Sequence, residues 1–226
     1  MKPIAVIPIE GIPEVGPGDD LAALIAEAAP ELDAGDVVVV TQKVVSKAEG
    51  RIVDATEKGA AIASESRRVL RRSGTMTIAE THHGFVCANA GVDSSNVTGD
   101  RVVLLPEDPD ASARRIRSRL AHLTGIDVAV VITDTFGRAW RIGQTDVAIG
   151  VAGMDPFVDY RGTTDTQGRE LFATRICIAD EIAGAAELVM GKAEGICAAI
   201  VRGLDIEPAR GAATAIVRSP SEDLFR

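Results

Sequence analysis

The chain has few aromatic side chains and a deficit of basic charge. Aromatic residues make up 3% of its 226 residues and hydrophobic residues 46%, so the core must be built mainly from Val, Ile, Leu and Ala. The formal net charge is −9. This balance argues against a nucleic-acid-binding protein, because contact with phosphate backbones needs a basic surface. Phosphate groups can still be bound through backbone amides, isolated Lys or Arg side chains, or a divalent metal held by carboxylates.

The chain also lacks a disulfide framework and long apolar runs. Its three cysteines, Cys87, Cys177 and Cys197, are odd in number and widely separated, which predicts reduced thiols and not disulfides or a zinc site. No segment approaches the roughly 20 consecutive apolar residues of a membrane-spanning helix. The first residues, MKPIAVIPIEGIPEV, do not have the pattern of a signal peptide. We therefore expect a cytoplasmic protein that does not bind membranes.

Strand and helix patterns alternate along the chain and predict a mixed α/β (α+β) fold. DVVVVT (36–41) and DVAVVIT (127–133) are continuous β-branched runs, typical of strands buried on both faces. DPDASARRIRSRLAHLTG (108–125) is the clearest helix, with Asp110 as its expected N-cap. Further helices are expected at 18–29, 64–74 and 177–191, and further strands at the N-terminus, on both sides of the turn at 82–84, and over 147–154 and 196–204. No repeat or linker divides the chain, so any subdomains are expected to be intertwined.

One candidate site follows the second buried strand. VVITDTFGR places Asp134 and Thr135 at the expected carboxyl end of that strand, where open α/β sheets hold their ligands. A carboxylate followed by a hydroxyl is a suitable pair of oxygen ligands for Mg²⁺ or Mn²⁺. The alternative is a turn that simply ends the strand. A phosphatase-type Asp-x-Asp-x-Thr motif does not fit, because position 136 is Phe.

A second candidate site lies in CANAGVDSSNV (87–97), on a loop of small residues. Asp93 and Asn96 could form only a capped turn, since Asp, Asn, Ser and Gly favour turns; alternatively, Asp93 holds a cation and Asn96 contacts a ligand. Lys43 and Lys47, expected on a loop after the 36–41 strand, could neutralise phosphate or could simply be solvated. The segment VMGKAEGI lacks the spacing of a P-loop, but its backbone amides could still contact phosphate.

Longer blocks of the sequence resemble a known family. These blocks are PIEGIPEVGPGDDLAALI, DVVVVTQKVVSKAEGR, NAGVDSSNV, VITDTFGRAWRIGQTDVAIGVAG, GRELFAT and ADEIAGAAELVMGKAEGICAAIVRGL. They run in order from end to end and closely resemble the F420 γ-glutamyl ligase family. The resemblance implies a GTP-dependent ligase that adds L-glutamate to the lactyl carboxylate of coenzyme F420-0 through an acyl phosphate, and then extends a γ-linked glutamate tail. It also implies an α/β fold of two intertwined subdomains, a homodimer, and Mg²⁺ or Mn²⁺ with K⁺ as cofactors.

The resemblance also assigns residues by position. It implies a first metal site at Asp93 and Asp134, the expected catalytic pair, and a second at Thr135. Glu194, the only acid in its turn, would be a further metal ligand. The residues expected to contact the nucleotide are Ile12, Pro13, Glu14, Val15, Gln42, Lys47, Asn96 and the turn Gly191, Lys192, Ala193, Glu194 and Gly195. A carboxylate must be activated before an amine can attack it, and phosphoryl transfer requires positioning and charge neutralisation by metal, which favours Asp93 as a metal ligand.

Three further expectations concern organisation and alternatives. Residues 1–226 should form a single ligase domain, without the C-terminal oxidoreductase-like domain of the actinobacterial two-domain form. The stretch between KAEGR and NAGVD is nevertheless short, and in this it resembles the N-terminal half of the actinobacterial form. The apolar segments 147–154 and 177–191 offer more apolar surface than one core needs, which predicts a homodimer. Two other hypotheses stay open: a related carboxylate–amine ligase for another acidic acceptor, and a non-catalytic nucleotide-binding protein.

Overall fold

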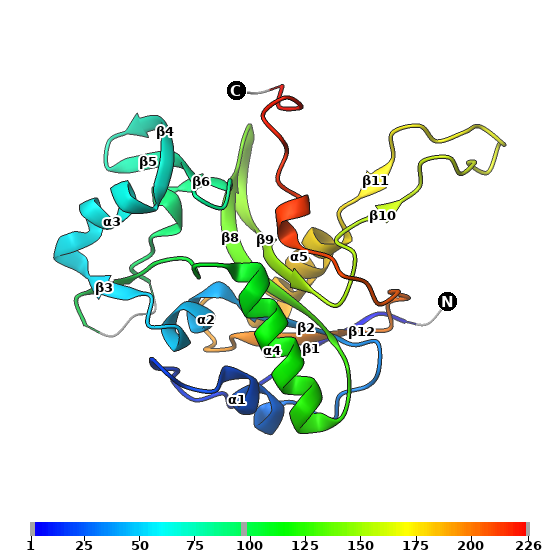
Figure 1. The fold of residues 1–226 in the computed structure, drawn as a ribbon, viewed down its shortest axis with the longest axis horizontal. Helices are drawn as coiled ribbons and strands as arrows, with labels where there is room; N and C mark the ends of the chain where they lie inside the picture. Colours follow the sequence, from blue (N-terminus) through cyan, green and yellow to red (C-terminus); the bar gives the residue numbers. More distant parts are fainter. Residues whose placement is uncertain (1–2, 96–98, 225–226) are drawn as a thin grey trace.

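A five-stranded mixed sheet forms the centre of the molecule, as seen in a computed structural model that describes residues 3–95 and 99–224 (Figure 1). In spatial order its strands are β1 Ala5–Pro8, β12 Ala198–Arg202, β2 Val37–Thr41, β8 Ala129–Arg138 and β9 Arg141–Ala152. β2 and β8 pair in parallel, and the other neighbours pair antiparallel. The mixed α/β fold expected from the sequence is confirmed.

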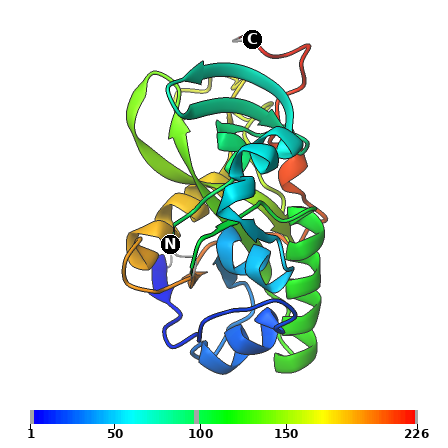
Figure 2. The same ribbon diagram turned by 90° about the vertical axis from the view of Figure 1, so that its left-hand side faces the viewer.

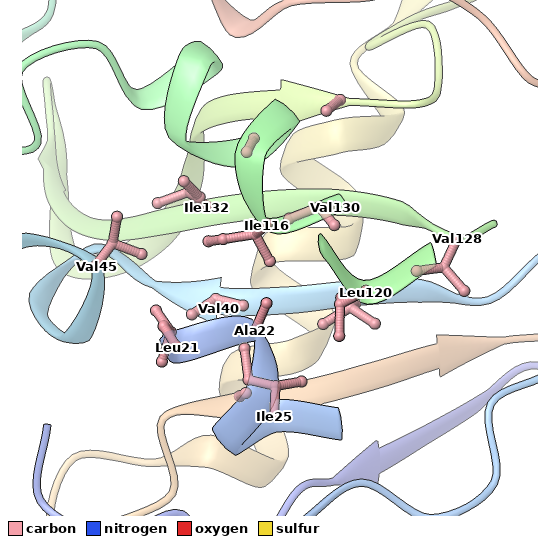
Figure 3. Packing of buried hydrophobic residues seen from close by; sticks show 14 of the residues in the cluster. Leu21, Ala22, Ile25, Val40, Val45, Ile116, Leu120, Val128, Val130 and Ile132 are labelled. Carbon is pink, nitrogen blue, oxygen red and sulfur yellow. The ribbon is translucent and has the colours of Figure 1, made fainter. Parts of the chain in front are cut away.

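Helices cover both faces of this sheet. α1 (Leu21–Ala28) and α4 (Pro109–Thr124) lie on one face and α5 (Ile178–Met190) on the other, as Figure 2 shows. Val38 and Val40 of β2 pack toward α1 and α4, whereas Val37 and Val39 pack toward α5. Figure 3 shows Val40 beside side chains of both α1 and α4. The prediction of strands buried on both faces is therefore confirmed, and each fully buried Val contributes about 1.5–3 kcal/mol through removal from water.

The start of α4 differs from the sequence prediction. Its N-cap is Asp108, whose carboxylate accepts a backbone N–H of the first turn at 2.8 Å. Asp110 is buried, and it accepts backbone N–H groups from Val151 at 2.8 Å, Ala213 at 2.7 Å and Thr214 at 3.2 Å. Asp110 therefore ties β9 and the C-terminal segment to α4, a role that the local capping pattern could not reveal.

Residues 42–103 form an insertion between the parallel strands β2 and β8. Its elements are α2 Gln42–Ala48, β3 Ile52–Asp54, α3 Lys58–Glu65, β4 Ser66–Ser73, β5 Met76–Thr81, β6 Val86–Ala88 and β7 Arg101–Val103. The insertion also contains 3₁₀ turns at Ala55–Glu57 and Asn89–Gly91. Outside it, a 3₁₀ turn at Ala213–Ala215 lies near the C-terminus. β3 pairs with β7, and β4, β5 and β6 form a three-stranded sheet. A small core of its own, which includes Val92, Val102 and Leu104, packs this insertion.

Two sequence predictions in the insertion are wrong. Residues 64–74 were expected to form a basic helix, but 66–73 form strand β4, paired with β5. Ser73 pairs with Met76 across a two-residue loop that starts with Gly74 at a φ of +57°, a conformation that suits a tight hairpin turn as well as the expected helix end. The segment that carries Lys43 and Lys47 is helix α2 and not a loop, because Val45 on its inner side joins the main core.

Two hairpins project from the body of the molecule. β8 does not end at Thr133 as expected but continues to Arg138, so that β8 and β9 form a long hairpin beyond the sheet (Figure 1). β10 (Val158–Asp159) and β11 (Arg175–Ile176) carry a second excursion, 160–174, which was expected as an exposed loop. Among the residues that the structure describes, no helix is long and apolar enough to cross a membrane.

Candidate functional site

A cavity of about 930 Å³ lies where β2 ends and β8 continues. The two strands pair in parallel up to Thr41 and Thr133. Beyond that pair the chain after β2 turns into α2 at Gln42, whereas β8 runs on to Arg138. One side of β8 is therefore left without a neighbouring strand, and the cavity opens there. Open α/β sheets bind their ligands at this kind of position, outside the carboxyl ends of parallel strands.

Five separate parts of the chain line this cavity. They are the N-terminal loop, α2, the segment from β6 to Ser95, the β8–β9 hairpin and the turn before β12. Ten of the residues assigned from the sequence are in the lining: Glu14, Gln42, Lys47, Asp93, Asp134, Thr135, Gly191, Lys192, Ala193 and Gly195. The expected catalytic pair and the expected nucleotide turn thus face one cavity, although the turn begins 98 residues after Asp93 and 57 residues after Asp134 in the chain.

The other assigned residues lie elsewhere. Val15 is buried in the main core, Ile12 packs against that core, and Pro13 is exposed between them. Glu194 is exposed, and its carboxylate accepts the N–H of the preceding residue at 3.0 Å. Asn96 lies outside the described residues. Ile12, Pro13, Val15 and Glu194 are therefore not part of the cavity lining. The roles assigned to these four residues and to Asn96 stay predictions.

Asp93 is fixed by both its backbone and its side chain. Its N–H and C=O are both bonded to Val103, at 3.0 and 2.8 Å. Its carboxylate accepts hydrogen bonds from Lys43 Nζ at 2.8 Å and from the Ser95 N–H at 2.8 Å and hydroxyl at 2.7 Å. Burial raises the pKa of Asp93, but the bonds from Lys43 and Ser95 outweigh it and hold the pKa below its ordinary value. Asp93 therefore forms the expected turn and at the same time presents an ionised carboxylate to the cavity.

A left-handed turn precedes Asp93. Asn89, Ala90 and Gly91 have φ values of +52°, +53° and +77°. A left-handed conformation costs a residue such as Ala about 1–2 kcal/mol, and strain of this kind tends to gather at functional sites. Gly91 has a second constraint, since a Cβ there would lie 2.5 Å from Leu105 Cγ. The glycine in this loop is thus required by both backbone conformation and close packing.

Asp134 lies within β8 and has an unusual protonation equilibrium. Burial raises its pKa to about 7, and the nearby carboxylates of Asp146 and Asp93 add to the rise, while the N–H of the next residue and Lys43 oppose it. Burial, together with the charge of Asp134, also raises the pKa of the Cys87 thiol to about 12. Cys87 is therefore a thiol at neutral pH and not a nucleophile. The carboxylates around Asp134 carry more negative charge than Lys43 neutralises, which is a suitable environment for an added cation.

A further carboxylate, which the sequence reasoning missed, lies beside Thr135. Asp146 of β9 is 2% exposed and pairs directly with Thr135 in the hairpin. It accepts hydrogen bonds from Thr135 Oγ1 at 2.5 Å, Thr133 Oγ1 at 3.2 Å and Lys192 Nζ at 3.3 Å. Lys192 also pairs with Glu187 at 2.9 Å. Burial lowers the pKa of Lys192, but Glu187 and Asp146 outweigh this and raise it, so the side chain is a cation.

Helix α2 presents two more candidate residues. Gln42 is 2% exposed, and its Oε1 accepts a hydrogen bond from Ser46 at 3.0 Å, which fixes the orientation of the amide. Lys47 is also buried and pairs with Glu14 at 2.6 Å. The Glu14 carboxylate is exposed and can move away into solvent, so that a phosphate could take its place beside the Lys47 ammonium. Lys47 is already buried, so phosphate binding would not need to bury it. The helix therefore presents a preformed amide and ammonium to the cavity.

The donor set of the cavity is suitable for a divalent cation of the magnesium type. In the described part of the chain, no three or more His, Cys, Asp or Glu side chains are arranged to hold a metal ion. Mg²⁺, however, is usually bound by one or two carboxylates together with water and substrate phosphates. Asp93, Asp134 and the Thr135 hydroxyl provide such ligands, all in the lining of one cavity. A cation here would offset both the burial and the carboxylate repulsion that raise the pKa of Asp134.

Sequence comparisons relate the chain to one family. A family described as F420-0:Gamma-glutamyl ligase matches residues 11–203. A coenzyme F420:L-glutamate ligase from Methanopyrus kandleri is 46% identical over 253 aligned residues, which cover 100% of both chains. A protein of the same name from Methanothermobacter thermautotrophicus is 43% identical and covers 99% of each chain. Another from Archaeoglobus fulgidus is 41% identical, over 99% of this chain and 96% of its own.

Proposed function

The chain belongs to the F420-0:gamma-glutamyl ligase family, and we propose that it attaches L-glutamate to coenzyme F420-0 during F420 biosynthesis. In this proposal the acceptor is the lactyl carboxylate of F420-0, the energy source is GTP, and further glutamates are added through γ-linkages. The observation that carries it is the end-to-end match to ligases of that name, over a chain whose cavity brings together carboxylates and lysines.

The reaction must activate a carboxylate before an amine can attack it. The γ-phosphoryl group of GTP is transferred to an oxygen of the acceptor carboxylate, which gives an acyl phosphate and GDP. The amine of L-glutamate then attacks the acyl carbon, the amide bond forms, and inorganic phosphate leaves with the former carboxylate oxygen. Phosphoryl transfer of this kind depends mainly on alignment and on neutralising charge on the phosphate oxygens.

Different residues of the cavity would bind the metal and the nucleotide. Asp93 and Asp134 would hold Mg²⁺ or Mn²⁺, with Thr135 at a second cation, and K⁺ would assist. The metal supplies positive charge at the phosphates and so stabilises the transition state. Lys47, Gln42 and the 191–195 turn would contact the nucleotide; in support of this, all of them line the cavity, except for the exposed Glu194. A cytoplasmic location is part of this proposal, and the free cysteines support it.

One experiment tests the proposal directly. The protein is incubated with F420-0, GTP, Mn²⁺ and L-glutamate, and the products are measured by mass spectrometry. We expect a product heavier by one or more glutamyl residues, and none when GTP is omitted. Activity only with a different acidic acceptor would instead identify a related carboxylate–amine ligase. Binding of GDP without any GTP consumption would identify a non-catalytic nucleotide-binding protein.

We also propose a homodimer, on grounds that differ from the sequence argument. Most apolar residues of the segments 147–154 and 177–191, which first suggested a dimer, are buried inside the chain, for example Val151 and Ile182, although Leu188 is exposed. Large apolar side chains are also exposed on the two projecting hairpins. Trp140 is 82% exposed and Ile142 fully exposed on the β8–β9 hairpin, and Phe172 is 76% exposed on the 160–174 excursion. Contact between these hairpins and a second copy would remove that surface from water.

A further inference from the structure

The partners of Asp146 set it apart from other buried carboxylates of this chain. Asp110 accepts backbone N–H groups, and Asp36 pairs with Arg202 and accepts a backbone N–H, so both hold the fold together. Asp146 instead accepts hydrogen bonds from three side chains of the cavity lining. Burial of a carboxylate is expensive unless it is well bonded. The bonds of Asp146 organise the cavity and contribute little to the backbone scaffold.

The geometry fixes the direction of the Thr135 hydroxyl. A hydroxyl has one proton to donate and two lone pairs that can accept a bond or bind a cation. Thr135 donates its proton to Asp146 at 2.5 Å, so its lone pairs are left for other partners. Lys192 Nζ already uses one of them, at 2.6 Å. Asp146 therefore determines which face Thr135 presents to the cavity.

The same carboxylate anchors the 191–195 turn. Lys192 comes directly after the end of α5 and reaches across to β8 and β9, where its ammonium contacts Thr135, Glu187 and Asp146. The Lys192 side chain therefore links the turn to the β8–β9 hairpin. Without the Asp146 carboxylate, the ammonium would lose a charged partner, and Thr135 would lose the acceptor that orients it.

We propose that Asp146 is a positioning residue, which holds the Thr135 hydroxyl and the Lys192 ammonium in place for the phosphates of the nucleotide. The proposal rests on the GTP-dependent function proposed above. Asp146 acts through its two partners and does not itself bind the metal. A charge-assisted hydrogen bond is stronger than a neutral one, so loss of the charge should weaken nucleotide binding by about tenfold or more.

Asp146→Asn tests the proposal, because it keeps the size of the side chain but removes the negative charge that strengthens the bonds from Thr135 and Lys192. Asp180→Asn is a matched control: Asp180 also bonds to β9, at the N–H of Ala148, but lies outside the cavity lining. Circular dichroism and melting establish that both variants are folded. Lys192→Gln is an independent variant on a side chain that is 56% exposed, so it keeps the test open if Asp146→Asn does not fold.

The first measurement needs no nucleotide. Endoproteinase Lys-C cleaves after lysine and must withdraw the Lys192 side chain from its partners. We expect cleavage after Lys192 to be about tenfold faster in Asp146→Asn than in the wild type, and unchanged in Asp180→Asn. An unchanged rate in folded Asp146→Asn would overturn the proposal. So would equal acceleration in the control, since that would indicate general loosening of β9.

The second measurement is GDP affinity by calorimetry, in EDTA and in Mn²⁺. We expect Asp146→Asn and Lys192→Gln each to weaken binding by about tenfold in both conditions, and the double variant to add little to either single one. A loss confined to Mn²⁺ would overturn the proposal and identify Asp146 as a metal ligand. If the wild type binds no GDP in either condition, the proposed GTP dependence fails, and the Lys-C rate still decides whether Asp146 anchors Lys192.

Discussion

Replacing Asp134 with Asn should stabilise the metal-free protein at alkaline pH and nearly abolish its activity. The pKa of Asp134 is raised from 3.8 to about 7, first by burial and then by the charges of Asp146 and Asp93. The folded protein therefore holds a proton on Asp134 between about pH 4 and pH 7 that the unfolded chain releases. Stability falls as the pH rises through this window, because the folded state must then accept an unfavourable charge.

The size of this effect follows from the shift. A rise of about 3 pKa units at 1.36 kcal/mol each gives an upper limit of about 4 kcal/mol above pH 7. Asp134→Asn removes the charge and keeps an oxygen that can accept a backbone N–H. In a chain of this size 1 kcal/mol moves the melting midpoint by about 2–4 °C. We expect the variant to melt several degrees above the wild type at pH 8 in EDTA, and within about 2 °C of it at pH 4.

The same substitution should remove the metal and with it catalysis. Charge stabilisation by a metal ion contributes several kcal/mol to a phosphoryl-transfer transition state, so kcat should fall by about a hundredfold or more. The assay is glutamate addition to F420-0 in Mn²⁺, followed by mass spectrometry, beside melting curves at the two pH values. A variant that melts lower at pH 8 and turns over normally would refute the reasoning and make Asp134 a structural residue.

Three other predictions concern the metal, the strained turn and the dimer. GDP should bind at least about tenfold more weakly in EDTA than in Mn²⁺, and equal affinities by calorimetry would contradict a metal between carboxylates and phosphates. Gly91→Ala should lower the melting midpoint by several degrees, because its Cβ meets Leu105 at 2.5 Å and its φ is +77°; an unchanged midpoint would show that the turn rearranges freely. Ile142→Ser with Phe172→Ser should convert a dimer into a monomer by light scattering at micromolar concentration, and a dimer that survives both changes lies on another surface.

The fold could be predicted where one local pattern decided the structure. The β-branched runs at 36–41 and 127–133 are buried on both faces, so they could not be confused with amphipathic helices, and the structure confirms both as strands. The basic residues at 66–73 were expected to belong to a helix closed by Gly74, whereas the structure has them in strand β4. Here the hairpin turn at Gly74 and pairing with β5 decide the structure, and both are interactions outside the segment itself.

The candidate site could be predicted in its outline but not in its full set of residues. Asp93 and Asp134 follow recognisable strands, and the structure places both in one cavity. Asp146 could not be found in the same way, because its position depends on hairpin register. A hairpin closed at Arg138 and Arg141 without irregularity would put Gln144 opposite Thr135. The register shift next to Gly137 moves Asp146 to that position instead.

The register of the β8–β9 hairpin thus decides the chemistry of the cavity. Successive side chains of a strand point to opposite faces, so Asp134 is directed toward Asp93 and Lys43, while Thr135 is directed toward Asp146. Both faces open into one cavity because β2 has ended and no longer covers the side of β8. A second irregularity, between Ile132 and Thr133, lies at this same point, and bulges commonly re-aim side chains beside active sites. A slip of one residue would exchange the two faces, so the irregularities at both ends of this segment are part of the site itself.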